Sequence, residues 1–207
     1  MSEPLGLPQD AFTKADPSDD AAFYAEPRLV THIDDQAIAA LTDFYRQVLP
    51  PGGALLDLMS SWVSHLPSEV AYGEVTGHGM NAEELAANPR LTRRFVQDLN
   101  ADPRLPLDTA SQDAAMICVG VQYLRRPVET LAEVRRVLRR GAPLIISFSN
   151  RCFPSKAVAI WRSTDGRGHA QLVALYLQQA GFSDIEAHSL TGGWPGDPLT
   201  AVVGRPG

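Results

Sequence analysis

The chain has 207 residues, of which 44% are hydrophobic, and it carries a net charge of −6. This length suits a single domain with a substantial core. The acidic balance disfavours a dedicated nucleic-acid binder, which would present a basic face. No apolar run approaches the length needed to span a bilayer, so we expect neither a nucleic acid nor a membrane as partner.

The N-terminus and the cysteines indicate the cellular setting. The first ten residues, MSEPLGLPQD, are acidic and lack the basic and apolar parts of a signal peptide. The two cysteines, Cys118 and Cys152, cannot form a disulfide framework, and no cluster of cysteine and histidine has the spacing of a zinc site. We therefore expect a cytoplasmic protein without a metal, and the sequence leaves its oligomeric state open.

The chain is expected to begin with a loose arm over residues 1–22, followed by a single domain over residues 23–207. The arm is rich in Pro, Asp, Ser and Ala and has no lasting hydrophobic period. From Ile38 to Val48, apolar residues recur at helical spacing, and Asp34 or Asp35 is the expected N-cap. The sequence PPGG that follows predicts the end of this helix.

Short apolar runs predict seven strands. They cover residues 54–58, 72–78, 94–99, 114–121, 143–149, 184–190 and 200–204. Further helices are expected at residues 82–87, 128–138 and 172–180. Asn81 is the expected N-cap of the first of these, with Glu84 reaching back to it in a capping box. The uninterrupted run AAMICVGV is typical of a strand buried on both faces of a parallel sheet.

This order predicts an α/β protein with a Rossmann-like, doubly wound sheet of seven strands and an antiparallel C-terminal hairpin at one edge. Strand and helix are expected to alternate through the first five strands. Ligands of such sheets bind beyond the carboxyl ends of the strands. That rule selects four loops, at residues 59–64, 79–81, 98–100 and 120–123.

The segment LPLDTASQDAAMICVGVQYLRRPVETLAEVRRVLRRGAPLIISF resembles the class I S-adenosylmethionine-dependent methyltransferases, especially the methyltransferase type 11 group. A Leu-Pro turn leads through a loop to an aspartate and a strand. The stretch RVLRRGAPLIIS is similar to the family's helix end, its Pro-Gly-Gly-like turn and the next strand. The resemblance covers roughly residues 37–182. It implies S-adenosylmethionine as cofactor and in-line methyl transfer to a small-molecule acceptor.

Carried over to this sequence, the resemblance implies a cofactor site at the four loops. The candidate cofactor-binding residues are Asp57, Met59, Ser60, Ser61, Gly79, Met80, Asn81, Asp98, Leu99 and Gly120. Asp98 matches the acid that meets the adenine amino group, and Leu99 would pack on the adenine ring. The hydroxyl of Ser61 is suited to meet the methionine carboxylate.

Two loops depart from the family's pattern. Met59 and Ser61 stand where glycines are expected, which allow close approach and a free φ, and Met59 and Trp62 are bulky. Gly79 stands where an acid normally binds the ribose hydroxyls. These departures support a second hypothesis, a catalytically inactive methyltransferase-like binding or scaffold protein. An NAD-dependent oxidoreductase is a distant third, because the chain lacks a G-x-G-x-x-G turn after the first strand.

In the family, the segment before the first helix folds over the cofactor, and the segment after the fifth strand contacts the substrate. The candidate substrate residues are Tyr24, Arg28, Tyr123, Ser149, Asn150 and Arg151. Arg151 would suit an anionic group. His32 and His65 are candidates for a general base, with surface or packing roles as the alternative. The sequence leaves the acceptor and the methylated atom open.

Overall fold

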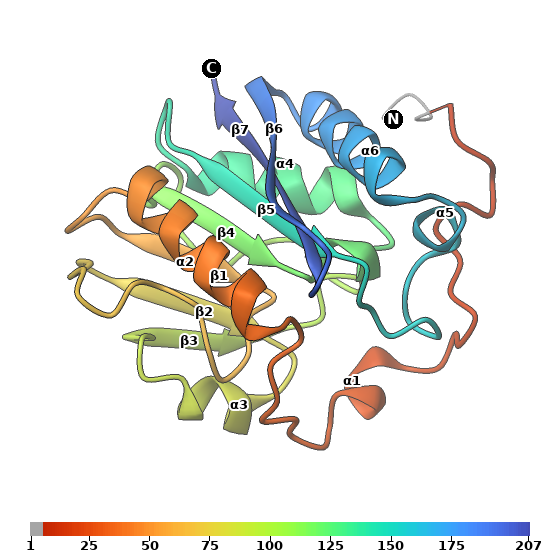
Figure 1. Ribbon diagram of the computed structural model, residues 1–207, viewed down its shortest axis with the longest axis horizontal. Coiled ribbons are helices and arrows are strands. Elements are labelled where there is room, and N and C mark those ends of the chain that lie inside the picture. The colour runs from red at the N-terminus through yellow and green to blue at the C-terminus, as the bar shows by residue number, and fades with distance from the viewer. Residues whose placement is uncertain (1–5) are drawn as a thin grey trace.

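The computed structural model describes residues 6–207 and shows a mixed sheet with helices on both faces (Figure 1). The strands are β1 (Leu55–Leu58), β2 (Val75–Gly79), β3 (Arg93–Val96), β4 (Ala114–Cys118), β5 (Leu144–Ser149), β6 (Phe182–Gly192) and β7 (Pro198–Pro206). Their order in the sheet is β3-β2-β1-β4-β5-β7-β6. Strands β1 to β5 are parallel, and β7 runs antiparallel to both of its neighbours. The expected doubly wound sheet and its edge hairpin are confirmed.

Helix α2 (Asp35–Val48) covers one face of the sheet (Figure 1). Asp34 caps it, because its carboxylate accepts the backbone N–H of Ala37 at 2.8 Å. The side chains of Leu41 and Tyr45 are fully buried against this face. The helical period of the sequence therefore marked the face of α2 that lies on the sheet.

The opposite face is covered by α4 (Pro127–Val137) and α6 (Gly166–Gln179) (Figure 1). The remaining short helices are α1 (Asp20–Phe23), α3 (Ala82–Ala87), α5 (Ala159–Arg162) and the 3₁₀ turn η1 (Val121–Tyr123). None of the helices within residues 6–207 is both long and apolar enough to cross a membrane.

The expected alternation of strand and helix is wrong at two crossovers. No helix lies between β1 and β2, over residues 59–74, or between β3 and β4, over residues 97–113. The first crossover contains Pro67, which has no backbone N–H to donate and disfavours the helical conformation of the residue before it. Leu66 is buried there in the same cluster as α2, with Tyr72 packed beside it. The irregular segment therefore helps to cover this face of the sheet, as a helix would.

Residues 1–22 were expected to form a loose arm, and residues 1–5 lie outside the described residues. Residues 6–22 run along one side of the molecule past α5 to α1 (Figure 1). The fully buried ammonium of Lys156 donates to the backbone oxygen of Ser18 at 2.8 Å and to its hydroxyl at 3.0 Å. Lys156 also pairs with Asp20, which in turn pairs with the buried Lys14. These contacts hold α1 beside the carboxyl ends of the strands.

Candidate functional site

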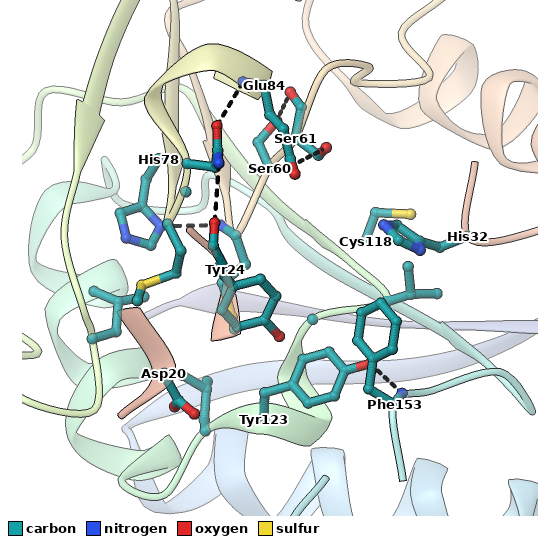
Figure 2. Close-up of a pocket in the computed structure, with 18 of the residues that line it drawn as sticks. Asp20, Tyr24, His32, Ser60, Ser61, His78, Glu84, Cys118, Tyr123 and Phe153 are labelled. Carbon is teal, nitrogen blue, oxygen red and sulfur yellow. Dashed lines mark hydrogen bonds between the residues drawn. The ribbon is translucent and has the colours of Figure 1, made fainter. Parts of the chain in front are cut away.

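A cavity of about 290 Å³ lies at the carboxyl ends of β1 to β4 (Figure 2). Small-molecule sites commonly enclose about 300 to 1,000 Å³, so this volume lies at their lower limit. We call the wall formed by residues 59–61, 78–84, 98–100 and 118–120 the strand side. The cap side is formed by Asp20, Tyr24, Thr31, His32, Tyr123, Leu124 and residues 151–153 after β5.

Almost all of the candidate cofactor residues line this cavity. Those that do are Met59, Ser60, Ser61, Gly79, Met80, Asn81, Asp98, Leu99 and Gly120. Asp57 does not, because its carboxylate is buried beneath the first loop, where it accepts the hydroxyl of Ser60 at 2.6 Å. Burial raises the pKa of Asp57 to about 6, although hydrogen bonds from Ser60 and Ser64 act to lower it.

The two bulky residues of the first loop leave the cavity open in different ways. Met59 has a φ of 58°, the left-handed conformation that glycine adopts without strain. Its side chain lies against Gly120, where an added Cβ would stand only 2.9 Å from the Cβ of Met59. Trp62 is not part of the cavity wall. Its Nε1 donates at 2.9 Å to the backbone oxygen of Val30, so Trp62 holds the chain segment that covers the cavity.

Gly79 is explained by the close approach of the first loop. An added Cβ at Gly79 would stand 2.6 Å from the backbone oxygen of Ser60. The N–H of Ser60 donates to the backbone oxygen of His78 at 2.6 Å. The ends of β1 and β2 therefore touch through their backbones, and a larger side chain at position 79 would separate them.

His78 is a residue of the site that the sequence did not single out. Its Nδ1 accepts the N–H of Met59 at 3.1 Å, so the ring proton is on Nε2, which donates to the backbone oxygen of Gln97 at 2.9 Å. Burial lowers the pKa of His78 to about 4, so the ring is neutral at neutral pH. His78 thus links the first loop to the end of β3.

Asn81 has the predicted capping role, and a second one. Its Oδ1 accepts the N–H groups of Glu83 and Glu84 at the start of α3. Its Nδ2 donates to the backbone oxygens of Tyr24 and Ala25, both at 3.0 Å. Asn81 therefore fixes the covering segment to the strand side.

The predicted capping box at Glu84 is wrong. Its carboxylate turns away from the helix N-cap and instead accepts the N–H of Arg28 at 2.7 Å and the hydroxyl of Ser61 at 2.6 Å. Glu84 is buried and lines the cavity (Figure 2). Each carboxylate oxygen accepts one of these bonds and keeps one lone pair for a further donor.

The hydroxyls of the two loop serines are already engaged. Ser60 donates to Asp57 and Ser61 donates to Glu84, and a hydroxyl has one proton to donate. The expected contact of the Ser61 hydroxyl with the methionine carboxylate stays a prediction, and it would require this hydroxyl to leave Glu84. The backbone N–H groups of Ser61 and Gly120 have no acceptor among residues 6–207, and both residues line the cavity. They are the donors available to an anion on the strand side.

Aromatic rings form most of the cap side (Figure 2). The hydroxyl of Tyr123 accepts the N–H of Phe153 at 2.9 Å, and the two rings stack with centroids 6.1 Å apart. Phe153 also meets the ring of His32 edge to face at 5.6 Å. Burial raises the pKa of Tyr123 to about 12 and raises that of Tyr24 as well, so both hydroxyls stay protonated.

Of the candidate substrate residues, Tyr24, Tyr123 and Arg151 line the cavity. Arg28, Ser149 and Asn150 do not. The guanidinium of Arg28 lies 4.5 Å from the ring centre of Phe23, and the hydroxyl of Ser149 accepts the N–H of Arg151 at 3.0 Å. The Nε of Arg151 donates to Asp197 at 2.7 Å.

The two candidate bases are separated by the fold. His32 lines the cavity and His65 does not. Burial lowers the pKa of His65 to about 4, with a smaller contribution from His32. His32 is thus the histidine that can face a ligand on the cap side.

Several residues of the cavity wall were not predicted, among them Asp20, Asn100, Cys118 and Phe153. The Nδ2 of Asn100 donates to Asp20 and to the backbone oxygen of Tyr123, both at 3.0 Å. Burial raises the pKa of Cys118 to about 12, so its thiol is not a nucleophile. Two of them had a signal: Asn100 lies in the ligand loop expected at residues 98–100, and Phe153 follows the fifth strand. The described residues contain no group of three or more metal-ligating side chains.

Comparisons with known proteins agree with this architecture. Residues 60–146 match the model of the methyltransferase domain family Methyltransf_11. No curated protein matches the chain by sequence. A methyltransferase of Haloferax volcanii, solved with its Trm112 activator, superposes with a TM-score of 0.61 at 16% identity, covering 84% of this chain and 91% of that one.

Other solved structures share the fold. A SAM-dependent methyltransferase of Thermotoga maritima gives a TM-score of 0.58 at 16% identity, with 83% of this chain and 91% of that one covered. The [4+2]-cyclase SpnF gives 0.62 at 16% identity, with 90% of each chain covered. These likenesses concern the fold, which by itself does not determine the reaction.

The fold is that of the class I S-adenosylmethionine-dependent methyltransferases. The segment that matches the methyltransferase domain model runs from the first loop into β5.

Proposed function

We propose that this protein transfers a methyl group from S-adenosylmethionine to a small-molecule acceptor within the cavity. The observation that carries the proposal is the convergence of four strand-end loops on one cavity, with the carboxylates of Glu84 and Asp98 on its wall. Ligands of doubly wound sheets bind at this edge.

The residues of the strand side fit the cofactor. Glu84 would accept the two ribose hydroxyls with its spare lone pairs, and so would replace the acid missing at Gly79. Asp98 would accept the adenine amino group beside the buried Leu99. The free N–H groups of Ser61 and Gly120 suit a carboxylate.

When bound, S-adenosylmethionine supplies a methyl group on a sulfonium, so the reactive chemistry belongs to the cofactor. The protein has to orient the acceptor and exclude water. Orientation of this kind contributes about 7 to 11 kcal/mol in favourable models. Tyr24 and Phe153 cover the cavity and would perform both tasks.

A second candidate function is ligand binding without catalysis. The missing helix after β1 favours it, because a helix N-terminus there would normally help to hold an anion. This alternative predicts weak binding or none at the strand side.

Calorimetric titration with S-adenosylhomocysteine separates the two functions. We expect binding, and an Asp98→Ala variant should bind about fivefold more weakly, the loss of roughly one hydrogen bond. Asp108→Ala, at an exposed acid outside the cavity, is the matched control and should bind like the wild type. Absence of binding at millimolar ligand would contradict the proposal, and an unchanged affinity of Asp98→Ala would contradict the adenine assignment.

A further inference from the structure

The cap side offers aromatic rings to an acceptor. Tyr24, Tyr123 and Phe153 line it, and Phe153 is held in place by its N–H bond to Tyr123 and by edge contacts with Phe23 and His32. Aromatic faces bind planar rings by stacking, which contributes beyond area burial alone.

The two charged side chains of the cap side that line the cavity, Asp20 and Arg151, are already paired. Arg151 donates to Asp197, and Arg28 lies on the ring of Phe23 and donates to its backbone oxygen at 2.9 Å. Asp20 receives the ammonium of Lys14 and the amide of Asn100. The guanidinium of Arg28 has no carboxylate partner within residues 6–207, but it does not line the cavity. A charged acceptor would therefore meet no unpaired charge on the wall of the cap side, and its desolvation would cost several kcal/mol.

Two polar groups of the cap side remain free. Neither the imidazole of His32 nor the hydroxyl of Tyr24 forms a side-chain hydrogen bond within the described part of the chain. Burial lowers the pKa of His32, while Glu84 raises it and Arg28 lowers it further. His65, whose pKa is lowered by burial and by His32, is itself neutral. His32 is therefore a neutral proton acceptor, and Tyr24 a donor.

We infer that the acceptor is an uncharged planar ring with a phenol-type hydroxyl, and that His32 accepts the proton of that hydroxyl. The inference rests on the proposed function. The ring would stack on the aromatic cap side. A phenol has a pKa near that of tyrosine, about 10, which allows transfer of its proton to an imidazole as the new bond forms.

The step balances in atoms and charge. The hydroxyl oxygen of the acceptor gains the methyl group and loses its proton to the imidazole of His32. The carbon–sulfur bond of the sulfonium breaks. Its electron pair stays on the sulfur, which becomes a neutral thioether. His32 passes the proton to solvent, so each turnover releases one aryl methyl ether, one S-adenosylhomocysteine and one proton.

The first test is binding to protein saturated with S-adenosylhomocysteine. Three probes share one ring system: 2-naphthol, 2-naphthoate and 2-naphthylmethylammonium. We expect 2-naphthol to bind at least tenfold more tightly than either charged analogue. Phe153→Leu should weaken naphthol about tenfold and leave the affinity for S-adenosylhomocysteine within twofold. Phe44→Leu, at a ring outside the cavity, should change neither.

Equal or tighter binding of a charged analogue, or no binding of naphthol, overturns the inferred acceptor class. These outcomes are read on protein that has bound S-adenosylhomocysteine, so they leave the proposed function standing. Failure to bind S-adenosylhomocysteine itself is the outcome that removes the proposed function.

The second test concerns His32. His32→Gln should keep both binding affinities within threefold and slow the methylation of 2-naphthol about 10² to 10⁴-fold, the usual contribution of a general base. The residual activity should rise about tenfold per pH unit as the hydroxyl ionises, whereas the wild type levels off. His188→Gln, outside the cavity, is the control. Unchanged turnover in His32→Gln, or binding without methylation by the wild type, overturns the role of His32.

Discussion

The strand side and the cap side of the cavity differ in what their polar groups do. On the strand side, Ser60, Ser61, His78 and Glu84 all take part in hydrogen bonds within the protein. On the cap side, His32 has a free imidazole among aromatic rings. A preorganised wall holds one fixed ligand well, whereas free groups are available for chemistry on a second molecule. Under the proposed function, the strand side would serve recognition and the cap side reaction.

Glu84→Gln is expected to have the largest effect on ligand binding at the strand side. It keeps the size of the side chain but removes the charge that strengthens each hydrogen bond. Hydrogen bonds to charged groups contribute about 1.5 to 3 kcal/mol, so we expect S-adenosylhomocysteine to bind about ten- to a hundredfold more weakly. Calorimetry measures this, with the exposed neighbour Glu83→Gln as control. Equal affinities would show that the strand side does not depend on Glu84.

Asp57→Asn tests the support beneath the strand side. The pKa of Asp57 is raised to about 6 in the folded protein, against 3.8 as reference, so between pH 4 and 6 the folded state binds the extra proton. The unfolding free energy of the wild type should therefore rise by about 1.4 kcal/mol relative to the variant as the pH falls from 8 to 5. Urea titrations of both proteins at the two pH values measure the difference. Parallel pH dependences would argue against a buried, titrating Asp57.

Trp62→Phe tests the link between the two sides. The variant loses the hydrogen bond to the backbone oxygen of Val30, worth about 1 kcal/mol, and so loosens the segment that covers the cavity. We expect S-adenosylhomocysteine to dissociate about fivefold faster in stopped-flow experiments. Trp194→Phe is the matched control, since Trp194 is 95% exposed. A dissociation rate equal to the wild type would show that Trp62 does not restrain the cover.

The centre of the sheet was predictable because β1, β2, β4 and β5 are short, buried runs whose carboxyl ends fall at one edge. Buried runs such as Leu55–Leu58 and Ala114–Cys118 leave little choice of secondary structure. The absence of a helix after β1 was not predicted, because the alternation of strand and helix in this fold class leads one to expect a helix there. The composition around Pro67 overrides that expectation locally.

Site residues were predictable where they follow a strand directly, as Ser61 and Asp98 do. Glu84 was not, because a glutamate three residues after Asn81 reads equally well as part of a helix cap. Its partners, Arg28 and Ser61, are 56 and 23 residues away in the chain. Likewise the aromatic cap side joins segments that only the complete fold brings together.

The bond between Lys156 and Ser18 spans 138 positions of the chain, and this has a consequence for biosynthesis. The residues that emerge first from the ribosome find their anchor only after three quarters of the chain has been made. Before that point, the nascent protein therefore has no covered cavity in which a bound ligand could stabilise the fold. A ligand that needs the covered cavity can be enclosed only after Lys156 has been made.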